Sequence, residues 1–230
     1  MYDVIIIKEG YCRPEAQGSM RASGTVTLLK GPKRNILVDA GSPWDKEEIV
    51  QGLLRQDVRP EDIHYMVCTH GHPDHVGNTN LFTKAVLIMG FNIQFEDQYF
   101  LHDFKQGIPY EIDEEIEVWP TPGHTSEDVS VVVKCTNLGT VVVAGDLFEC
   151  EADLDSPNLW QDQSHSPHQQ EQSRIEVLRV ADFIVPGHGP MFQVPGHIKS
   201  QMKVVMIVEE QFCSPQLTST KSECIIVETE

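Results

Sequence analysis

Four side chains that commonly bind metal ions lie within six residues of one another in this 230-residue chain: His70, His72, Asp74 and His75. They directly follow the apolar run from Tyr65 to Cys68, which is typical of a buried strand. Polar groups at this density would repel one another or lose hydration unless they shared a partner. The segment therefore predicts a loop that wraps metal ions, and the alternative is a histidine-rich turn with no ligand.

The spacing within this segment favours two ions. His70 and His72 are two residues apart and would point to the same side of an extended segment, toward one ion. Asp74 and His75 follow the bend at Pro73 and would reach a second ion. Two ions need more ligands than these four side chains, so the rest of the chain must supply them.

Three later segments share one format, in which an apolar strand runs into a glycine beside a metal-binding residue. These residues are His124, Asp146 and His188. Glycine permits close approach of the backbone, and strand ends held by proline and glycine turns suit a rigid set of ligands. We therefore predict one ion held by His70, His72 and His124, a second held by Asp74, His75 and His188, and Asp146 as a bridge between them.

This set of ligands predicts hydrolytic chemistry. Nitrogen and oxygen ligands without a thiolate suit zinc, with iron or manganese as alternatives, so we expect two Zn²⁺ per chain. A water molecule shared by two ions about 3.5–4 Å apart would lose a proton near neutral pH and become a nucleophile. Asp74 is the candidate catalytic residue, because its carboxylate could also orient that nucleophile.

Length and composition predict one α/β domain. A hydrophobic fraction of 40% can build a core, and clustered strands with interspersed helices indicate two sheets covered by helices. We place the domain at residues 1–208 and expect an acidic, disordered tail at 209–230. No apolar run approaches the roughly 20 residues that span a bilayer. The first residues also lack the features of a signal peptide, so we expect a cytoplasmic protein without a membrane partner.

The periodicity also predicts individual elements. Strands are expected at residues 4–7, 25–29, 35–39, 62–69, 85–89, 116–119, 129–133, 140–144 and 182–185. Helices are expected from Ser42-Pro43 and from Ser166-Pro167 to about Val180, because serine before proline is typical of a helix start. Loops are expected at residues 11–22 and 149–163, a loop-rich flap at 91–110, and a short helical segment at 201–208.

The charge of the chain restricts its partners. Thirty-five acidic residues against 17 basic ones give a net charge of −18. No cluster of lysine or arginine is present in the sequence, and nucleic-acid-binding proteins usually carry a basic patch. The charge therefore disfavours polyanions in general, but it does not forbid a short phosphate contact at a metal site. The six scattered cysteines are expected to be free thiols.

Together these segments resemble the metallo-β-lactamase superfamily, whose T-H-x-H-x-D-H signature matches residues 69–75. The resemblance implies an αββα sandwich in a single domain, with a dinuclear site along one edge of the two sheets. Asp39, in Val38-Asp39-Ala40-Gly41, matches the aspartate that supports the histidine loop from behind the ligands in this family.

Particular sequence segments, including residues 139–149 and 180–190, resemble one subgroup of the family more specifically. That resemblance implies a zinc-dependent endoribonuclease that acts on histone pre-mRNA in the cytosol and nucleus. No residue matches an RNA-contacting role, so the substrate-binding residues are not predicted, and a homodimer is left open.

Three other functions are considered. A glyoxalase II-like hydrolase of small thioesters or esters suits a compact acidic domain. A mono-iron enzyme resembling persulfide dioxygenases would use the same ligands. The third is a binding module without enzymatic activity, and the complete set of metal ligands argues against it. A basic strip beside the metals would favour RNA, whereas a closed apolar pocket built from residues 91–104 would favour a small acyl substrate.

Overall fold

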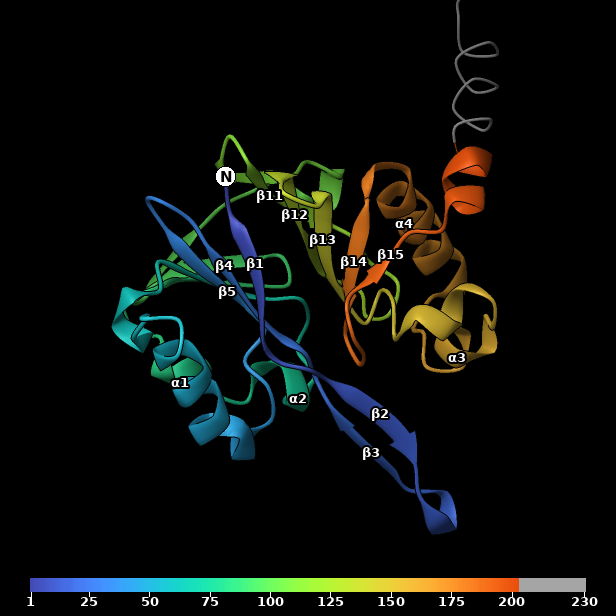
Figure 1. Cartoon of the computed structure of the whole chain (residues 1–230), viewed down its shortest axis with the longest axis horizontal. Coiled ribbons are helices and arrows are strands. Elements are labelled where there is room, and N and C mark those ends of the chain that lie inside the picture. Colours follow the sequence, from blue (N-terminus) through green and yellow to red (C-terminus); the bar gives the residue numbers. More distant parts are fainter. Residues whose placement is uncertain (203–230) are drawn as a thin grey trace, which may run out of the picture.

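The computed structural model describes residues 1–202, which fold into an αββα sandwich (Figure 1). The first sheet has seven strands in the order β1-β4-β5-β6-β7-β8-β9. Their bounds are β1 Asp3–Lys8, β4 Val26–Lys30, β5 Asn35–Val38, β6 Tyr65–Cys68, β7 Val86–Met89, β8 Asn92–Phe95 and β9 Gln98–Phe100. The predicted fold class is thus confirmed.

The second sheet has six strands in the order β10-β11-β12-β13-β14-β15. Their bounds are β10 Tyr110–Asp113, β11 Ile116–Pro120, β12 Val129–Thr136, β13 Gly139–Gly145, β14 Phe183–Pro186 and β15 Phe192–Gln193. The α-helices within residues 1–195 are α1 Lys46–Leu54, α2 Pro73–Val76, α3 Asn158–Gln161 and α4 Pro167–Val180. Within residues 1–202, none of them has the length and apolarity needed to cross a membrane.

Parallel pairing explains why the predicted ligands meet at one edge of the sandwich. β5, β6 and β7 run parallel in the first sheet, and β13 and β14 run parallel in the second. The carboxyl ends of parallel strands lie at the same edge of a sheet, so the residues that follow β6, β13 and β14 are brought together. The Val129 amide donates to the Thr69 carbonyl at 2.8 Å and joins the two sheets at this edge.

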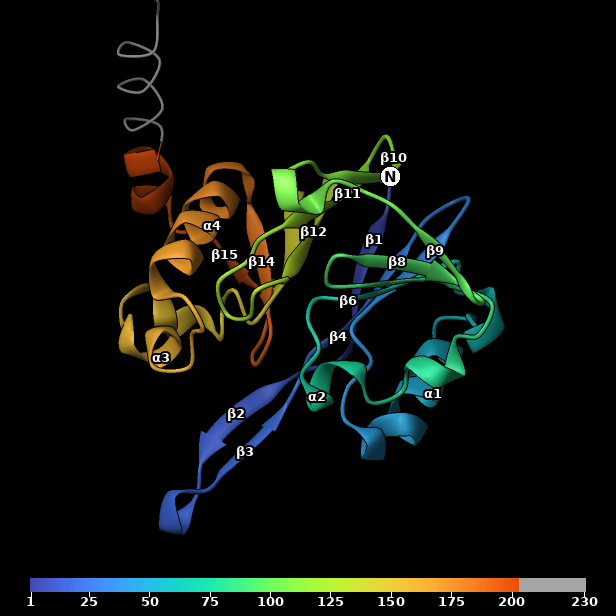
Figure 2. The same cartoon turned by 180° about the vertical axis from the view of Figure 1, so that it is seen from behind.

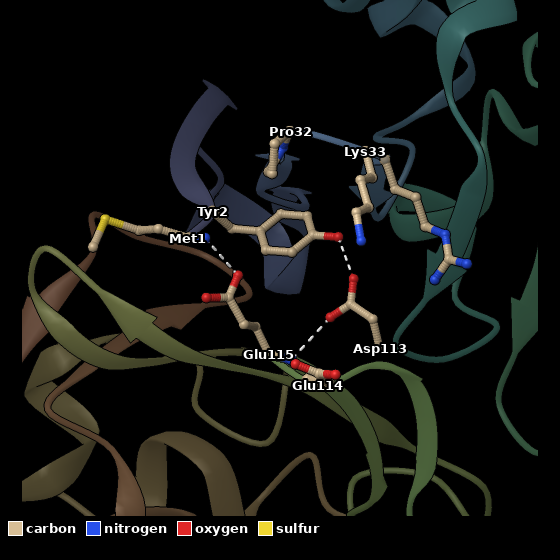
Figure 3. A pocket seen from close by; sticks show the side chains of 8 residues that line it. Met1, Tyr2, Pro32, Lys33, Asp113, Glu114 and Glu115 are labelled. Carbon is tan, nitrogen blue, oxygen red and sulfur yellow. Dashed lines mark hydrogen bonds and ion pairs between the residues drawn. The ribbon is translucent and has the colours of Figure 1, made fainter.

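The N-terminal residues join the two sheets at another place (Figure 3). The Met1 ammonium lies 2.7 Å from a Glu115 carboxylate oxygen, and the Tyr2 hydroxyl donates to Asp113. β1 starts opposite Lys30, the last residue of β4, and Lys30 pairs with Asn35, the first residue of β5. The contact is therefore at the edge of the sheet where β5 begins. The predicted ligands lie at the opposite edge, where β5 and β6 end. A pocket of about 300 Å³ lies here, and it contains none of the predicted ligands.

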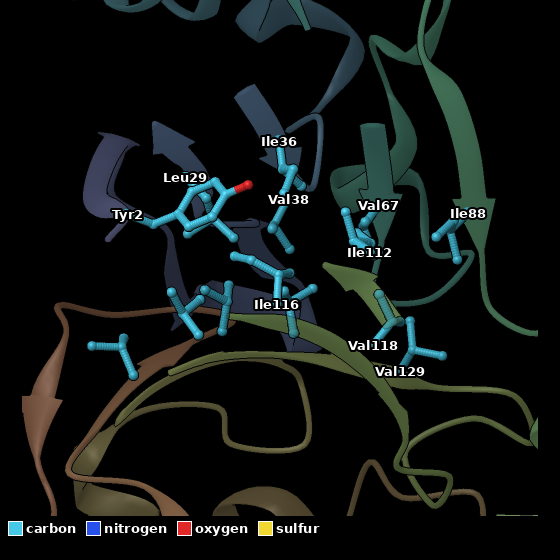
Figure 4. Packing of buried hydrophobic residues seen from close by; sticks show 14 of the residues in the cluster. Tyr2, Leu29, Ile36, Val38, Val67, Ile88, Ile112, Ile116, Val118 and Val129 are labelled. Carbon is cyan, nitrogen blue, oxygen red and sulfur yellow. The ribbon is translucent and has the colours of Figure 1, made fainter. Parts of the chain in front are cut away.

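Three apolar clusters fill the spaces between the layers. The central one lies between the two sheets and is rich in valine and isoleucine, with Val38, Val67, Val118 and Val129 facing one another (Figure 4). A second cluster packs α1 against the first sheet through Ile49 and Leu53. The third packs α4 against the second sheet. The strands that position the site are therefore buried on both faces, which matches their continuous apolar runs.

Residues 11–22 are not the loop that the sequence predicted. They form β2 (Tyr11–Pro14) and β3 (Met20–Ser23), a hairpin that projects from the body (Figures 1 and 2). The prediction failed because most of these side chains are exposed on both faces, so the alternation of apolar and polar residues that marks a half-buried strand is missing.

Two other loop predictions were wrong in part. Residues 91–110 contain β8 and β9, which extend the first sheet, followed by a 3₁₀ turn at Phe104–Gln106. Residues 149–163 contain a 3₁₀ turn at Glu151–Leu154 and the helix α3. Both stretches have short elements of three or four residues, too short for a clear periodicity.

The predicted helix starts are confirmed. Ser42 and Asp45 form a capping box around a 3₁₀ turn at Pro43–Asp45 that leads into α1. The helix predicted from Ser166-Pro167 to Val180 is α4. The last described residues, 196–202, are helical. The remainder of the segment predicted at 201–208 and the tail predicted at 209–230 lie outside the described residues.

Candidate metal centre

All seven predicted ligands converge at the edge where the two sheets meet. His70, His72, Asp74 and His75 follow β6, and α2 begins at Pro73 within this segment. His124 lies between β11 and β12, Asp146 follows β13, and His188 follows β14. Most of these side chains are buried, but His72 is exposed and Asp74 is half-buried. A substrate can therefore approach from the side of His72 and Asp74.

The first group of ligands has the dimensions of a tetrahedral site. His72 Nδ1 lies 2.9 Å from His70 Nε2 and 3.0 Å from His124 Nε2. One oxygen of Asp146 lies 3.5 Å from His70 Nε2 and 3.3 Å from His124 Nε2. Ligand atoms about 2.0–2.1 Å from a tetrahedral ion are separated by roughly 3.4 Å. Three nitrogens and one oxygen thus lie close enough together to hold one metal ion, two of the separations being somewhat shorter than this value.

The second group lies on the other side of Asp146. His75 Nε2 is 3.1 Å from Asp146 Oδ1, and His188 Nε2 is 3.3 Å from Asp146 Oδ2. An oxygen of Asp74 is 3.9 Å from each of these two imidazole nitrogens. His75 Nε2 and Asp146 Oδ1 are buried and have no hydrogen-bond partner in the described structure. Since buried polar atoms are almost always satisfied, the residues present fit a second ion in contact with Asp146.

Contacts on the far side of the imidazole rings fix their orientation. His75 Nδ1 lies 2.7 Å from Asp39 Oδ2, and the same carboxylate accepts from the Thr69 backbone amide at 2.7 Å. His188 Nδ1 lies 3.2 Å from the Ser23 carbonyl oxygen. These contacts favour the tautomer that leaves Nε2 free to face an ion. Asp39 therefore lies behind His75, where the family resemblance leads us to expect a supporting aspartate.

The electrostatics of the cluster favour a bound cation. Burial lowers the pKa of His70 well below its usual value. Burial acts in the same direction on His75 and His188, but the charge of Asp146 outweighs it, so that the pKa of His75 is well above its usual value and that of His188 is raised to about 9. Although burial acts to raise the pKa of Asp146, the charges of His75 and His188 hold it well below its usual value. These pKa values favour positive charge on His75 and His188 beside an ionised Asp146. A metal ion would supply that charge in place of the protons, because metal binding releases the protons of its ligands.

Glu149 is a residue of this cluster that the sequence analysis missed. It is buried, and burial together with the charge of Asp146 raises its pKa to about 8. Glu149 Oε1 lies 3.8 Å from His124 Nδ1, and both atoms are buried without a hydrogen-bond partner in the described structure. Glu149 therefore faces the Nδ1 side of His124, as Asp39 faces that of His75, but at 3.8 Å rather than 2.7 Å it would have to move closer to accept a hydrogen bond. Its position three residues after Asp146 was the available signal, but Glu149 was assigned to the start of a loop.

Replacing Glu149 with alanine is expected to weaken metal binding at the first group about 10- to 100-fold, the usual effect of losing such a supporting carboxylate. Glu149→Gln should recover part of this loss, because the amide oxygen can still accept a hydrogen bond from His124 Nδ1. Competition with a zinc chelator measures the change. Glu151→Ala removes an exposed carboxylate nearby and should leave the affinity unchanged. Equal affinities in all three variants would show that His124 does not depend on Glu149.

The chain matches proteins of one family in sequence and in fold. The family model described as the metallo-beta-lactamase superfamily matches residues 21–188. A Xenopus laevis protein called metallo-beta-lactamase domain-containing protein 1 is 46% identical over 198 residues, which cover 85% of this chain and 83% of the relative. The Homo sapiens protein of the same name is 42% identical over 222 residues, with coverage of 84% and 82%.

Among solved structures, an N-acyl homoserine lactone hydrolase superposes with a TM-score of 0.59 at 18% identity and covers 80% of this chain and 92% of its own. That enzyme was solved with its product, N-hexanoyl-L-homoserine, bound at its catalytic metal centre. At this level of identity the superposition supports the fold.

Proposed function

The chain belongs to the metallo-beta-lactamase superfamily of metal-dependent hydrolases, and from this premise we propose that it is a dinuclear zinc endoribonuclease that hydrolyses RNA phosphodiesters. The observation that carries the proposal is the position of Asp146, whose carboxylate lies between two groups of imidazole ligands. A pair of ions about 3.5–4 Å apart is the arrangement suited to an in-line displacement at phosphorus.

Two bound zinc ions would supply Lewis-acid charge and lower the pKa of a water molecule. The chain's own residues then orient the reaction. Asp74 is half-buried, and one of its oxygens lies 3.9 Å from both His75 Nε2 and His188 Nε2. Its carboxylate is thus placed to accept a hydrogen bond from the attacking water and to hold that water in line. Burial of Asp146 and of most of the imidazoles keeps the surroundings of the ions rigid.

Support for RNA as the substrate comes from the resemblance of the sequence to an RNA-cleaving subgroup, which also suggests the cytoplasm and nucleus as compartments. The open approach past His72 is compatible with a polymer. The test is cleavage of a short single-stranded RNA by the zinc-loaded protein, with the same sequence as DNA and a small thioester as parallel substrates. RNA cleavage that is lost in His72→Ala supports the proposal, and turnover of the thioester alone refutes it.

A second candidate function is hydrolysis of a small thioester or ester, and one pocket favours it. A groove of about 320 Å³ starts at His70 and Gly71 and contains Ser126 and Glu127. The same two residues line a pocket of about 420 Å³ whose walls include Phe91 and Phe104, with the rings stacked 5.5 Å apart. The acyl chain of an ester or thioester substrate could extend from the metal centre into this pocket.

Phe91→Ala tests this second function. For an acyl substrate in the pocket, loss of the aromatic contact should lower kcat/KM for a long-chain thioester about tenfold, since aromatic contacts contribute roughly 1 kcal/mol or more beyond the area they bury. The acetyl thioester, too short to reach Phe91, serves as the internal control and should change little. Equal effects on both thioesters would exclude the pocket as an acyl site.

A further inference from the structure

The hairpin of residues 11–23, here called the arm, is unlike the rest of the molecule. It projects from the sandwich as an isolated pair of strands, β2 and β3 (Figures 1 and 2). Its side chains are mostly exposed, and a two-stranded hairpin is only marginally stable in water by itself. An element of this kind gains stability when a partner covers it.

One face of the arm carries cationic and aromatic groups. The Arg13 guanidinium lies 5.1 Å from the centre of the Tyr11 ring. Arg13 is directly opposite Arg21 in the register of the two strands, and like charges in opposite positions destabilise a hairpin. Glu15 forms an ion pair with Arg21, whereas no ion pair of Arg13 is found within residues 1–202. The pair of arginines is thus incompletely neutralised by the chain itself.

The root of the arm is attached to the metal loops. The Ser23 carbonyl lies 3.2 Å from His188 Nδ1, and the Gly24 amide donates to the Asp74 carbonyl at 3.2 Å. Ser23 Oγ also donates to Asp45 at 2.8 Å. The residue before Asp45 is Trp44, whose side chain is 87% exposed. The root of the arm is therefore fixed to two segments that carry ligands, and an exposed aromatic residue lies next to one of its contacts in the sequence.

We propose that the arm is a docking surface for single-stranded RNA, on which Arg13 and Arg21 bind backbone phosphates and Tyr11 stacks against a base. This inference rests on the proposed function and deepens it. The arm carries two arginines and one glutamate, a net charge of +1, in a chain with a net charge of −18, and a positive local charge attracts a polyanion. Stacking on an aromatic ring and pairing with arginine are the contacts by which proteins hold unpaired RNA strands.

The competing occupant is a second copy of this chain, whose acidic surface could also complement the arginines. RNA is favoured because the exposed Tyr11 ring, with the Arg13 guanidinium 5.1 Å from its centre, combines the aromatic and cationic groups that bind unpaired bases and phosphates.

The test is the affinity of the zinc-loaded protein for a fluorescent, cleavage-resistant phosphorothioate RNA at several salt concentrations. Arg13→Ala/Arg21→Ala should raise Kd at least tenfold and make the dependence of log Kd on log salt shallower by about 1.4, because each phosphate contact on a single strand contributes about 0.7. Tyr11→Ala should raise Kd about 5- to 100-fold without changing that slope, because stacking involves no counterion release. Arg55→Ala/Arg59→Ala removes two exposed arginines elsewhere and is the matched control.

Three outcomes would overturn the inference about the arm. The first is a double variant of the arm that keeps the affinity and the salt slope of the unmodified protein. The second is an equal change in the control variant. The third is a dimer, detected by sedimentation, that the arm variants abolish while RNA binding stays unchanged, which would assign the arm to contacts between copies. An unmodified protein that binds RNA through the arm but does not cleave the unmodified RNA would instead refute the proposed endoribonuclease activity.

Discussion

Replacing Asp146 with asparagine is expected to release metal from both groups of ligands and to lower hydrolytic activity by about a thousandfold or more. One carboxylate oxygen lies 3.1 Å from His75 Nε2 and the other lies 3.3 Å from His124 Nε2, so a single substitution disturbs both sites. The metal ions of such a centre contribute several kcal/mol to stabilisation of the transition state, and about 4 kcal/mol corresponds to a thousandfold change in rate. Metal content and kcat on the same preparation measure both effects.

His124→Ala is the informative comparison for this prediction. His124 approaches the first group only, so its loss should empty mainly one site and leave the second occupied. Asp97→Asn changes an exposed carboxylate between β8 and β9, away from the ligands in the sequence, and should retain both ions. If Asp146→Asn kept a full complement of metal, Asp146 would not bridge the two sites.

Gly187→Ala is the second substitution with a large expected effect. A Cβ atom at this position would lie 1.9 Å from Asp146 Oδ1, far closer than any real contact. The carboxylate cannot move away without leaving its place between the two groups of ligands. We therefore expect at least about a hundredfold loss of metal affinity, and a loss of about 1–3 kcal/mol in the free energy of unfolding because a packed site is overfilled. Chelator competition and denaturant unfolding check the two parts.

Gly71→Ala is the matched control, because it makes the same change of residue beside the ligands His70 and His72. A Cβ atom at Gly71 would meet no other atom within 4 Å, so metal content should be retained. The free energy of unfolding should change by less than about 1 kcal/mol, since replacing glycine at an unstrained position mainly reduces the entropy of the unfolded chain. Wild-type metal affinity in Gly187→Ala would show that Asp146 does not need the position assigned to it.

The candidate ligands could be predicted from the sequence because the pattern that marks each of them is local. Each group of ligands follows an apolar strand, and all of the ligands except His75 are next to glycine or proline, so the identity of the residues and their place after a strand are both visible in the sequence. Parallel pairing of β5 with β6 and of β13 with β14 then brings these ends together. The supporting role of Asp39 required the family resemblance, because a single aspartate after a strand is otherwise an ordinary turn residue.

The parts that could not be predicted depend on tertiary contacts. Glu149 lies near His124 Nδ1 only in the folded chain, because the two residues are far apart in the sequence. The arm has no buried face, so its strands lack the pattern that reveals strands elsewhere. The sequence also did not reveal that Arg13 and Arg21 are neighbours, because they are eight positions apart and are brought together only by the register of β2 and β3.

The measurement that tests the account most directly is the number of metal ions bound to the intact protein, determined by native mass spectrometry after loading with zinc. The account predicts two zinc ions per chain in the unmodified protein and one in His124→Ala. A chain that holds a single ion at saturating zinc, with His124→Ala unable to bind any, would contradict the assignment of Asp146 as a bridge between two sites.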